Sequence, residues 1–420
     1  MKVALAHYSD CGDISGVTTW LLDFCNHLVC NGIKVYVHLH HFGDELQQAS
    51  ILPPLTRLGV EVHSVKRIGN LLADSRQTLS FLNHVRPDIF LPQCLHAHYI
   101  AAAHAGLQGL PWIFTMHSDD VDYWCIAENL PPESFGGKTV CVSQYLARKL
   151  SETDLSLNPL VIASSVIPYG ISPSQTHSSF SDNPFRVVYC GRLVEHQKRI
   201  SLVIETLVQA CTLSKNIEAY VIGDGSERQS CEKYVAESKL TSRIRFLGRV
   251  QPENVQALIC QFHAILLMSD FEGLPVSLLE AMSAGVVPVA RSIDSGVPEL
   301  VHHQSTGLLV HGDPNEAAES LKLLSEDPHL WEILSMNARS LVHSKYTSLQ
   351  SFFSYKTLIQ DLVSSSTPQF PLGVDNLHTI IPSDARFQRQ YVSSRESSES
   401  HKSNRLYKFA RRLASKFFPF

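Results

Sequence analysis

The segment HAILLMSDFEGLPVSLLEAMSAGVVPVA, residues 263–290, contains a short apolar run, a turn, a helical pattern and a second apolar run. HAILLM and VVPVA have the length and composition of buried strands, and SDFEG supplies the turn before the helix. We expect Pro275 at the first helical position and Gly285 at the helix end, where these residue types are favoured. A strand, a helix and a strand in this order predict a parallel sheet covered by helices.

Two series of alternating strands and helices surround this segment. The first series contains KVALAH, IKVYVHLH, DIFLPQCLH, PWIFTMH and KTVCVS, and the second contains FRVVYCG, IEAYVIG, IRFLG, HAILLM and VVPVA. Between the two series, residues 171–184 (ISPSQTHSSFSDNP) are rich in Ser and Pro and show no periodicity, which is typical of a linker. We therefore predict two doubly wound α/β domains, residues 1–170 and 185–345, with a cleft facing the carboxyl ends of both sheets.

The chain beyond residue 345 is expected to comprise three parts. Residues 346–366 are predicted to form a helix that packs back on the fold, and residues 367–400 a flexible segment, because they gain Ser and lose hydrophobic periodicity. A helix within residues 401–420 would place apolar side chains on one side and basic side chains on the other. The apolar set is Leu406, Phe409, Leu413 and Phe417, and the basic set is Arg405, Lys408, Arg412 and Lys416. Such a helix is typical of contact with an anionic membrane surface; a helix that docks on a partner protein and a disordered basic end remain alternatives.

Composition limits the class of protein further. The chain has 420 residues and a net charge of −5, so it has no overall basic field for nucleic acid. Its ten cysteines occur singly, without a CxxC pair, and several lie in apolar runs, which predicts buried thiols in a reducing compartment. The sequence shows no signal peptide and no apolar run of about 18 residues. We therefore expect a cytoplasmic protein.

Two glutamates in the first segment are candidates for ligand binding. Glu272 lies in the turn, and Glu280 lies about two helical turns further along, among Leu and Ala side chains. A carboxylate in an apolar setting needs a partner, and it can accept hydrogen bonds from both hydroxyls of a vicinal diol of a sugar or ribose. The free amides at the start of this helix would suit an anion or hydroxyl oxygens. The alternative interpretation is structural, with one glutamate capping the loop and the other in an internal salt bridge.

The loop CGRLVEHQKR, residues 190–199, follows a predicted strand and supplies two cations. Gly191 ends the strand, and Arg192 and Lys198 follow it. An arginine fork together with a lysine point charge suits a diphosphate and would stabilise a departing phosphate. A solvated charged loop is the alternative interpretation.

The loop VIGDGSE, residues 221–227, is a second candidate for nucleotide contact. Gly223 and Gly225 flank Asp224 in a tight turn, where the backbone can approach a ligand closely. The chain lacks the GxGxxG expected of a two-domain dehydrogenase, and it contains no GxxxxGK[ST] phosphate loop.

Together, in this order and spacing, these motifs resemble the C-terminal half of glycosyltransferase family 4. The matching segments are GRLVEHQKRISLVIE, VIGDGSE, EGLPVSLLE, EAMSAGVVPVA, SGVPELV and GLLV. The N-terminal half is similar to the same family through HAH (96–98), TMH (115–117), VSQYLARKL (142–150) and VIPYGI (166–171). The resemblance covers residues 1–366. It implies the GT-B fold, in which two facing Rossmann-like domains with parallel sheets bind donor and acceptor in the cleft between them.

The resemblance also implies roles for individual side chains. Arg192 and Lys198 would hold the donor diphosphate, and His117 would contact the donor sugar near the reacting carbon. Glu280 would bind the ribose hydroxyls, and Glu272 would bind the transferred sugar. The residues implied in catalysis are Glu272, His117, Arg192 and Lys198. The residues implied in donor binding are Gly16, Gly191, Arg192, Lys198, Gly223, Gly225, Glu272, Gly273, Leu274 and Glu280.

Backbone groups would complete the donor site that the resemblance implies. Gly16, ahead of the first helix, would let the backbone approach the phosphate or the acceptor. The amides of Gly273 and Leu274 would help to bind the transferred sugar.

Three positions depart from the usual pattern of the family. Ser15 occupies a position that is usually glycine, and Arg199 occupies another where glycine is frequent. Tyr169 stands where the family commonly has asparagine, which leaves the role of this side chain open. Serine is small, so the first change is mild, and Arg199 need not disturb the phosphate contacts.

The activity implied by the resemblance is retaining transfer of a sugar from a nucleoside diphosphate, UDP or GDP, to a hydroxyl of a sugar or lipid-linked sugar. The implied mechanism is front-face substitution, in which the leaving phosphate stays beside the sugar and helps to deprotonate the acceptor. No cofactor and no metal ion are expected, because two cations already serve the phosphate. The expected setting is polysaccharide or glycolipid synthesis in the cytoplasm, with peripheral contact at the inner face of the membrane through residues 401–420.

Two other functions remain as alternatives. One is a sugar phosphorylase or synthase of the same fold. The other is a catalytically silent scaffold of a membrane polysaccharide assembly, although a scaffold need not retain all four charged residues of the site: Arg192, Lys198, Glu272 and Glu280.

Two histidine-rich runs, HLHH (38–41) and CLHAH (94–98), are not expected to bind metal. Strand alternation places His38 and His40 on one face, but neither run has the acidic or thiolate partners of a zinc site. DVD, residues 120–122, resembles the DxD motif that binds a divalent metal in the other large glycosyltransferase fold; here we expect a solvated loop.

Overall fold

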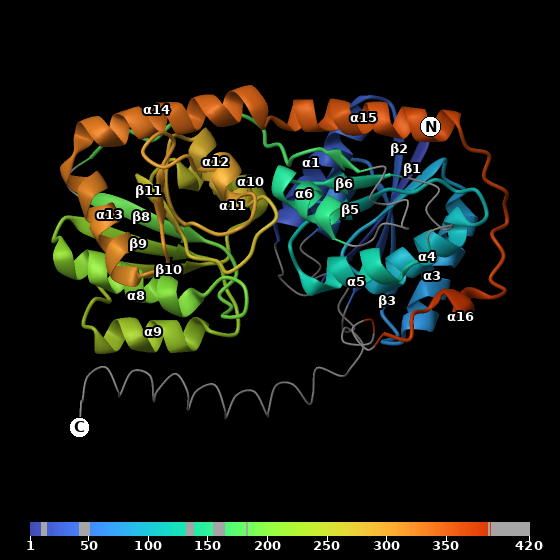
Figure 1. The fold of residues 1–420 in the computed structure, drawn as a ribbon, viewed down its shortest axis with the longest axis horizontal. Helices are drawn as coiled ribbons and strands as arrows, with labels where there is room; N and C mark the ends of the chain where they lie inside the picture. The colour runs from blue at the N-terminus through green and yellow to red at the C-terminus, as the bar shows by residue number, and fades with distance from the viewer. Residues whose placement is uncertain are drawn as a thin grey trace.

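The fold is given by a computed structural model that describes residues 1–9, 15–41, 51–131, 138–153, 164–181, 184–384 and 387. Two α/β halves face each other, and in both of them parallel strands are covered by helices (Figure 1). The prediction of an α/β fold with two facing Rossmann-like halves is confirmed.

The N-terminal half is built on a parallel sheet in the order β3-β2-β1-β4 and a smaller parallel sheet in the order β5-β6-β7. Its central strand is completely buried from Val3 to Ala6, as expected of a strand covered on both faces. The strands are β1 (Lys2–Ser9), β2 (Lys34–His41), β3 (Glu61–Lys66), β4 (Ile89–Pro92), β5 (Phe114–Met116), β6 (Thr139–Cys141) and β7 (Ser165–Val166). The helices are α1 (Gly16–Cys30), α2 (Leu52–Arg57), α3 (Leu71–Val85), α4 (His96–Gly106), α5 (Val121–Asn129) and α6 (Gln144–Glu152).

The C-terminal half is built on one parallel sheet in the order β10-β9-β8-β11-β12-β13. Its strands are β8 (Phe185–Cys190), β9 (Ile217–Ile222), β10 (Ile244–Gly248), β11 (Ala264–Leu267), β12 (Val287–Arg291) and β13 (Leu308–Val310). Its helices are α8 (Ile200–Leu213), α9 (Arg228–Glu237), α10 (Pro252–Ile259), α11 (Val276–Ser283), α12 (Val297–Leu300), α13 (Pro314–Glu326) and α14 (Pro328–Lys345). The order places β9, β8 and β11 side by side, so the loops that follow these strands lie at one edge.

The segment that predicts the fold forms β11, α11 and β12 as expected. Gly285 has a φ of +73° directly after the helix, where glycine adopts the left-handed conformation without strain, so the predicted helix end is confirmed. Pro275 is the N-cap rather than the first helical residue, and α11 begins one position later at Val276. The difference is one residue and leaves the following amides at the helix start.

The chain crosses between the two halves twice, at adjacent positions. Ile171 forms a parallel bridge with Thr347, with hydrogen bonds of 3.0 and 2.9 Å to the residues on either side of it. A Cβ on Gly170 would overlap the carbonyl of Thr347, so this position requires glycine. After the first crossing, Ser174 and Ser178 bond to the end of α11, so the Ser-rich linker is held against the C-terminal half.

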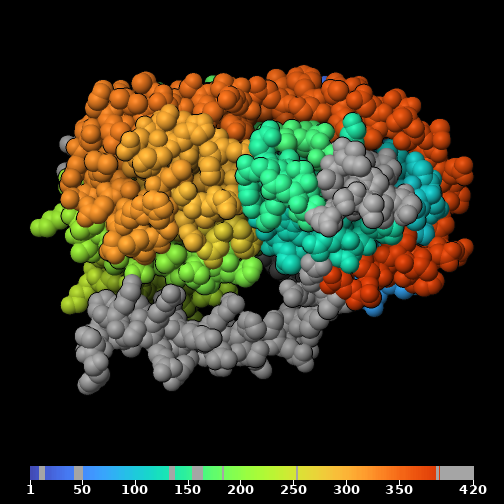
Figure 2. Space-filling view, viewed as in Figure 1, coloured from blue at the N-terminus to red at the C-terminus, as the bar shows by residue number. Residues whose placement is uncertain are grey.

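After the second crossing, α15 (Ser348–Ser364) returns to the N-terminal half. It packs on α1, where His27 bonds to Ser348 at 3.1 Å and stacks on Phe352. α14 and α15 lie end to end along one side of the molecule and span both halves (Figures 1 and 2). None of the helices in the described ranges combines the length and the apolarity needed to cross a membrane.

Residues 367–384 differ from the predicted flexible segment. Leu372 is buried, and its amide and carbonyl both bond to the side chain of Asn83 on α3. α16 (Leu377–Ile380) contacts α4, and Phe387 is fully buried against His96. Because a few apolar residues anchor this stretch, its lack of hydrophobic periodicity alone predicts too much flexibility. The remainder of the predicted segment and the basic tail, residues 388–420, lie outside the described residues.

Candidate functional site

The two glutamates of the predicted site are both buried, one shortly before α11 and one within it. Glu272 lies in the loop after β11 and is 5% exposed, and Glu280 lies on the helix and is 9% exposed. The loops that carry Arg192 and Lys198 follow the neighbouring strand β8. The structure therefore brings the predicted carboxylates and cations to one edge of the C-terminal sheet.

Lys198 and Glu272 form an ion pair within this group. The Lys198 Nζ donates to Glu272 Oε1 at 2.6 Å, and the side chains are 15% and 7% exposed. The predicted phosphate-binding cation and the predicted sugar-binding carboxylate are thus direct partners. Each of them satisfies the other in the absence of ligand, because an unpaired buried charge would be costly.

Arg192, in the same loop as Lys198, is exposed. Its guanidinium donates to the side-chain oxygen of Gln197 at 2.7 Å, and the Gln197 amide donates to the carbonyl of Phe271 at 3.2 Å. The loop after β8 is therefore tied to the loop after β11. A fork-shaped cation placed here has free donors for an anionic ligand.

Glu280 has a different environment. Burial raises the pKa of its carboxyl to about 7, and no described side chain bonds to it. A carboxyl without a protein partner at the inner end of a site can accept hydrogen bonds from ligand hydroxyls.

The start of α11 lies against the N-terminal half. Within the described part of the chain, no acceptor bonds to the backbone amides of Gly273 and Leu274, so both amides are available to a ligand. A Cβ on Gly273 would overlap the carbonyl oxygen of His117, and a Cβ on Gly16 would lie 3.0 Å from the Val276 side chain. The two glycines therefore allow the halves to meet closely at the cleft.

His117 is held by two neighbours from its own half. One ring nitrogen bonds to the side-chain oxygen of Gln93 and the other to the hydroxyl of Tyr169. Burial lowers the pKa of the His117 ring to about 3, so the ring is neutral. Tyr169, the departure from the family pattern, thus positions His117. With both nitrogens occupied, a ring contact to a sugar would require one partner to move.

Close packing between the loops after β8 and β9 requires glycine at positions 223 and 225, which the sequence alone does not reveal. A Cβ on Gly223 would overlap the carbonyl oxygen of Gly191, and a Cβ on Gly225 would overlap that of Leu193. The two loops therefore pack backbone against backbone. This packing explains the glycines whether or not a nucleotide also approaches them.

Arg199 also has a local explanation. It is the N-cap of α8 and has a φ of +49°, a left-handed conformation that glycine adopts more readily. Ion pairs to Glu195 at 3.6 Å and Asp270 at 3.5 Å hold the side chain.

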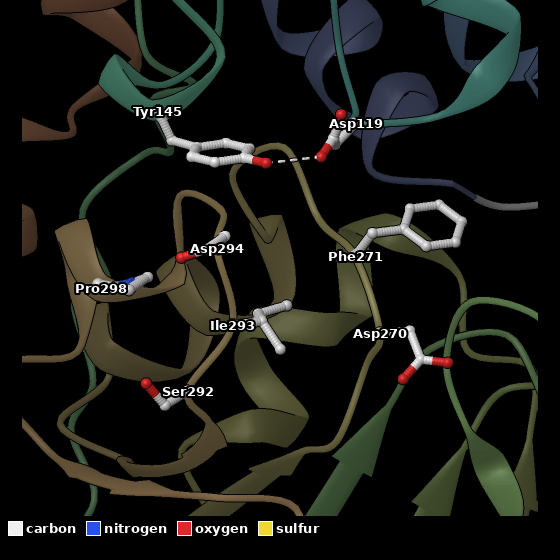
Figure 3. Close-up of a pocket in the computed structure, with 8 residues that line it drawn as sticks. All are labelled: Asp119, Tyr145, Asp270, Phe271, Ser292, Ile293, Asp294 and Pro298. Atoms are coloured by element: carbon white, nitrogen blue, oxygen red, sulfur yellow. Dashed lines mark hydrogen bonds between the residues drawn. The ribbon is translucent and has the colours of Figure 1, made fainter. Parts of the chain in front are cut away.

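A pocket of about 500 Å³ opens between the two halves, and its lining includes Asp270 and Phe271, which directly precede Glu272 in the chain (Figure 3). Asp119 and Tyr145 come from the N-terminal half, and the Tyr145 hydroxyl donates to Asp119 at 2.8 Å. Asp119 also accepts from Lys149 at 2.7 Å and from the Trp124 indole at 2.6 Å. The C-terminal half contributes Asp270, Phe271, Ser292, Ile293, Asp294 and Pro298. None of these lining residues was among the predicted site residues.

Glu299 joins the halves at the rim of this pocket. Its carboxylate accepts from the amides of Gln144 at 3.1 Å and Tyr145 at 2.9 Å, the first residues of α6. A carboxylate at a helix start satisfies free amides and complements the helix dipole. Sequence spacing gives no signal for this contact, because the partners lie 155 and 154 positions apart.

The DVD motif is part of a helix start rather than a solvated loop. Asp120 is the N-cap of α5, and its side chain accepts from the amide of Asp122 at 2.9 Å. Asp122 lies 3.6 Å from the ring of His96. The expected loop is corrected accordingly.

The fold with its two facing Rossmann-like halves is the GT-B fold of glycosyltransferases. The structure of Anabaena Alr3699/HepE in complex with UDP and glucose matches 86% of this chain and 99% of that chain, with a TM-score of 0.69 and 18% identity. The pneumococcal O-GlcNAc transferase GtfA in complex with UDP and GlcNAc matches 86% and 99%, with a TM-score of 0.70 and 10% identity. At these identities the likeness establishes the fold.

Family models match both halves of the sequence. The Glycosyltransferase Family 4 model matches residues 14–175, and the Glycosyl transferases group 1 model matches residues 174–341. The chain belongs to glycosyltransferase family 4, as its motifs predict.

Two curated relatives illustrate the range of the family. The lipopolysaccharide 1,6-galactosyltransferase of Escherichia coli K12 is 31% identical over 188 residues, which are 44% of this chain and 48% of that protein. The human phosphatidylinositol N-acetylglucosaminyltransferase has one subunit that is 25% identical over 310 residues, 69% of this chain and 61% of that protein. The chain thus spans about half the length of the first relative and less than two thirds of the second.

Proposed function

We propose that this chain is a retaining glycosyltransferase that moves a sugar from a UDP or GDP sugar to a hydroxyl acceptor in polysaccharide or glycolipid synthesis. The observation that carries the proposal is the contact of Lys198 with Glu272 beside the open amides at the start of α11. A cation, a carboxylate and free amides within one site suit a diphosphate joined to a sugar. The likeness to relatives that are named for lipopolysaccharide and for phosphatidylinositol supports the setting.

In the proposed mechanism, the donor exchanges partners within the site. The diphosphate takes the Lys198 ammonium from Glu272 and adds the Arg192 guanidinium, and Glu272 then accepts hydroxyls of the transferred sugar. Glu280 accepts the ribose hydroxyls. The two cations and the amides of Gly273 and Leu274 stabilise negative charge as the bond from sugar to phosphate breaks. The freed phosphate oxygen takes the acceptor proton on the same face, and the configuration at the reacting carbon is retained.

The acceptor would enter through the pocket between the halves. Asp119, Asp270 and Asp294 line it with carboxylates, which accept hydrogen bonds from sugar hydroxyls. His117, positioned by Gln93 and Tyr169, would mark the boundary between acceptor and donor sugar. A sugar or a lipid-linked sugar is the acceptor that we propose.

A donor panel tests the proposal. Full-length protein is incubated with UDP-glucose, UDP-galactose, UDP-N-acetylglucosamine and GDP-mannose, and both the melting temperature and the released nucleoside diphosphate are measured. We expect at least one donor to stabilise the protein and to be consumed slowly even by water. The Lys198→Met variant is expected to lose the stabilisation by the donor. Its matched control is Lys215→Met, because Lys215 is exposed and lies ahead of β9, outside the site.

The same samples separate the alternatives. Binding without consumption in the presence of varied acceptors would indicate a silent scaffold. Phosphate-dependent release of a sugar 1-phosphate would indicate a phosphorylase. Proton NMR of the first product formed reports the anomeric configuration, and an inverted product would contradict the retaining mechanism.

We also propose that residues 401–420 hold the enzyme at the cytoplasmic face of an anionic membrane; these residues lie outside the described part of the chain. Their six cations and no acid support the proposal. Full-length protein and a variant lacking residues 401–420 are sedimented with vesicles that contain anionic lipid, at low and at high salt. We expect only the full-length protein to pellet, and less of it at high salt. Equal pelleting of both proteins would exclude the tail as the anchor.

A further inference from the structure

Three buried histidines meet in the N-terminal half, in a group that the proposed donor chemistry does not use. His38 and His40 lie on β2, and His98 lies in the first turn of α4. The three side chains are 1%, 0% and 0% exposed, and one ring nitrogen of each lies within 4.8 Å of the others. The two histidine-rich runs, considered separately in the sequence, are therefore one cluster in space.

The hydrogen bonds of His40 and His98 leave two lone pairs facing each other. The Nδ1 of His98 lies 2.9 Å from the carbonyl of Gln93, which can only accept, so this nitrogen carries the proton. The Nε2 of His40 lies 3.0 Å from the side-chain oxygen of Gln77, whose amide nitrogen is committed to the carbonyl of Lys66. The remaining nitrogens, His40 Nδ1 and His98 Nε2, then both lack a proton, yet they lie 2.8 Å apart.

A shared proton would relieve this conflict only at a high cost. It would create an imidazolium in a fully buried site, where an unpaired charge is costly. The buried carboxylate of Asp74, which interacts electrostatically with His40, is committed to Arg67 at 3.2 Å and to the amide of Ile68 at 2.8 Å. A cation that binds both lone pairs resolves the conflict without protonating either ring.

His38 completes the set of ligands. Neither of its ring nitrogens has a hydrogen-bond partner among the described residues, although the ring is buried and stacks on Phe81. A backbone group of His63 on the adjacent strand also lies near the ring, but its geometry falls short of a normal hydrogen bond. A buried imidazole with two unsatisfied nitrogens is rare unless a ligand or an ion uses one of them.

We propose that His38, His40 and His98 bind one transition-metal ion through their imidazole nitrogens. Three neutral imidazoles suit Zn²⁺ and neighbouring late first-row ions, with a fourth position left for water or another ligand. Nitrogens at about 2.0 to 2.1 Å from a tetrahedral ion lie roughly 3.3 Å apart, so the 2.8 Å pair needs only a small separation. Gln77 and the Gln93 carbonyl serve as the outer partners that orient the rings.

The site is connected to the proposed active site through Gln93. The carbonyl of this residue receives the His98 ring, and its side-chain oxygen receives the His117 ring. A bound ion would fix His98 and, through it, the loop after β4 that positions His117. The role assigned to the ion is therefore structural, and it acts on positioning rather than on the reacting atoms.

Metal content and metal-dependent stability test the proposal. Untagged full-length protein is stripped with a chelator and titrated with Zn²⁺ or Co²⁺, and bound metal, melting temperature and visible absorption of the Co²⁺ form are recorded. We expect one ion per chain, a higher melting temperature and the strong absorption typical of four-coordinate Co²⁺. Failure of the stripped wild-type protein to bind either ion would overturn the proposal.

His38→Leu is the decisive variant, because among the described residues its ring makes no hydrogen bond of normal geometry. The metal-free variant is expected to melt at the wild-type temperature or above, whereas its metal affinity falls by more than 100-fold. Gln77→Leu, which removes an outer partner, is expected to weaken binding about 10- to 100-fold. If His38→Leu bound metal as tightly as wild type, the cluster would be an ordinary buried histidine pair.

A second group must be distinguished from this cluster. Glu61, His63 and His84 also lie close together, at the exposed edge of the same sheet. The double variant His63→Gln/His84→Gln removes that group and is expected to retain the ion. Loss of the ion in this double variant but not in His38→Leu would assign the metal to the exposed group instead.

Discussion

Replacing Lys198 with methionine tests both the ion pair and the donor site in one protein. Met fills a similar volume, but it leaves the 7% exposed Glu272 carboxylate without its partner at 2.6 Å. Removing one member of a buried pair typically costs about 3 to 5 kcal/mol, and the 15% exposure of Lys198 places the expectation at the lower end, about 3 kcal/mol. Glu272→Gln in the same background removes the unpaired charge and should restore most of this loss.

The same variant should also bind the donor nucleotide more weakly. A charge-assisted contact to phosphate contributes about 1.5 to 3 kcal/mol, so Lys198→Met should weaken UDP or GDP binding by roughly 10- to 150-fold. Chemical denaturation of the four proteins of the double-mutant cycle measures the pair, and calorimetry with the nucleotide measures the contact. A Lys198→Met protein with wild-type stability and wild-type nucleotide affinity would refute both the pairing energy and the diphosphate role.

Three further outcomes are expected. Glu280→Gln should weaken nucleotide binding yet raise the free energy of unfolding at pH 8 by about 3 kcal/mol. Burial raises the pKa of the Glu280 carboxyl from 4.5 to about 7, so the wild-type protein is most stable below pH 4.5 and loses stability as the pH rises through 7. Gln stays neutral and avoids this loss. Denaturation at pH 5 and 8 checks this, and a gap between the proteins that does not grow with pH would contradict it. Arg192→Ala should lower nucleotide affinity about 10-fold or more without changing the melting temperature, because this side chain is exposed; calorimetry and a thermal melt give the answer. Glu299→Ala should cost about 1 kcal/mol and loosen the contact between the halves, seen as a larger radius of gyration in X-ray scattering; an unchanged radius would show that the contact does not hold the halves together.

The sequence predicts those features that depend on neighbours along the chain. The strand, turn and helix around Glu272, the end of α11 at Gly285 and the apolar surroundings of Glu280 all follow from local pattern. Parallel order then places the loops after β8, β9 and β11 together, because the carboxyl ends of adjacent strands share one edge.

The side-chain contacts within the site join residues far apart in the chain, and spacing along the sequence does not predict them. Lys198 pairs with Glu272 across 74 positions, and Tyr169 bonds to His117 across 52. The same limit applies to His98, which lies 58 positions from His40. The difference over residues 367–384 has another cause, since a handful of buried apolar side chains outweighs the loss of hydrophobic periodicity.

The two adjacent crossings at Ile171 and Thr347 determine how the halves can move. The two connecting segments are hydrogen-bonded to each other at one point and therefore act as a single hinge. Rotation of one half about this hinge leaves the interior of each half intact. The cleft lies away from the hinge, and a small rotation therefore separates Gly273 from His117 and Glu299 from α6 together. Opening the proposed donor site and breaking these contacts would then be one event. Under the proposed function, the rate of product release is coupled to how strongly the Glu299 carboxylate binds the first amides of α6.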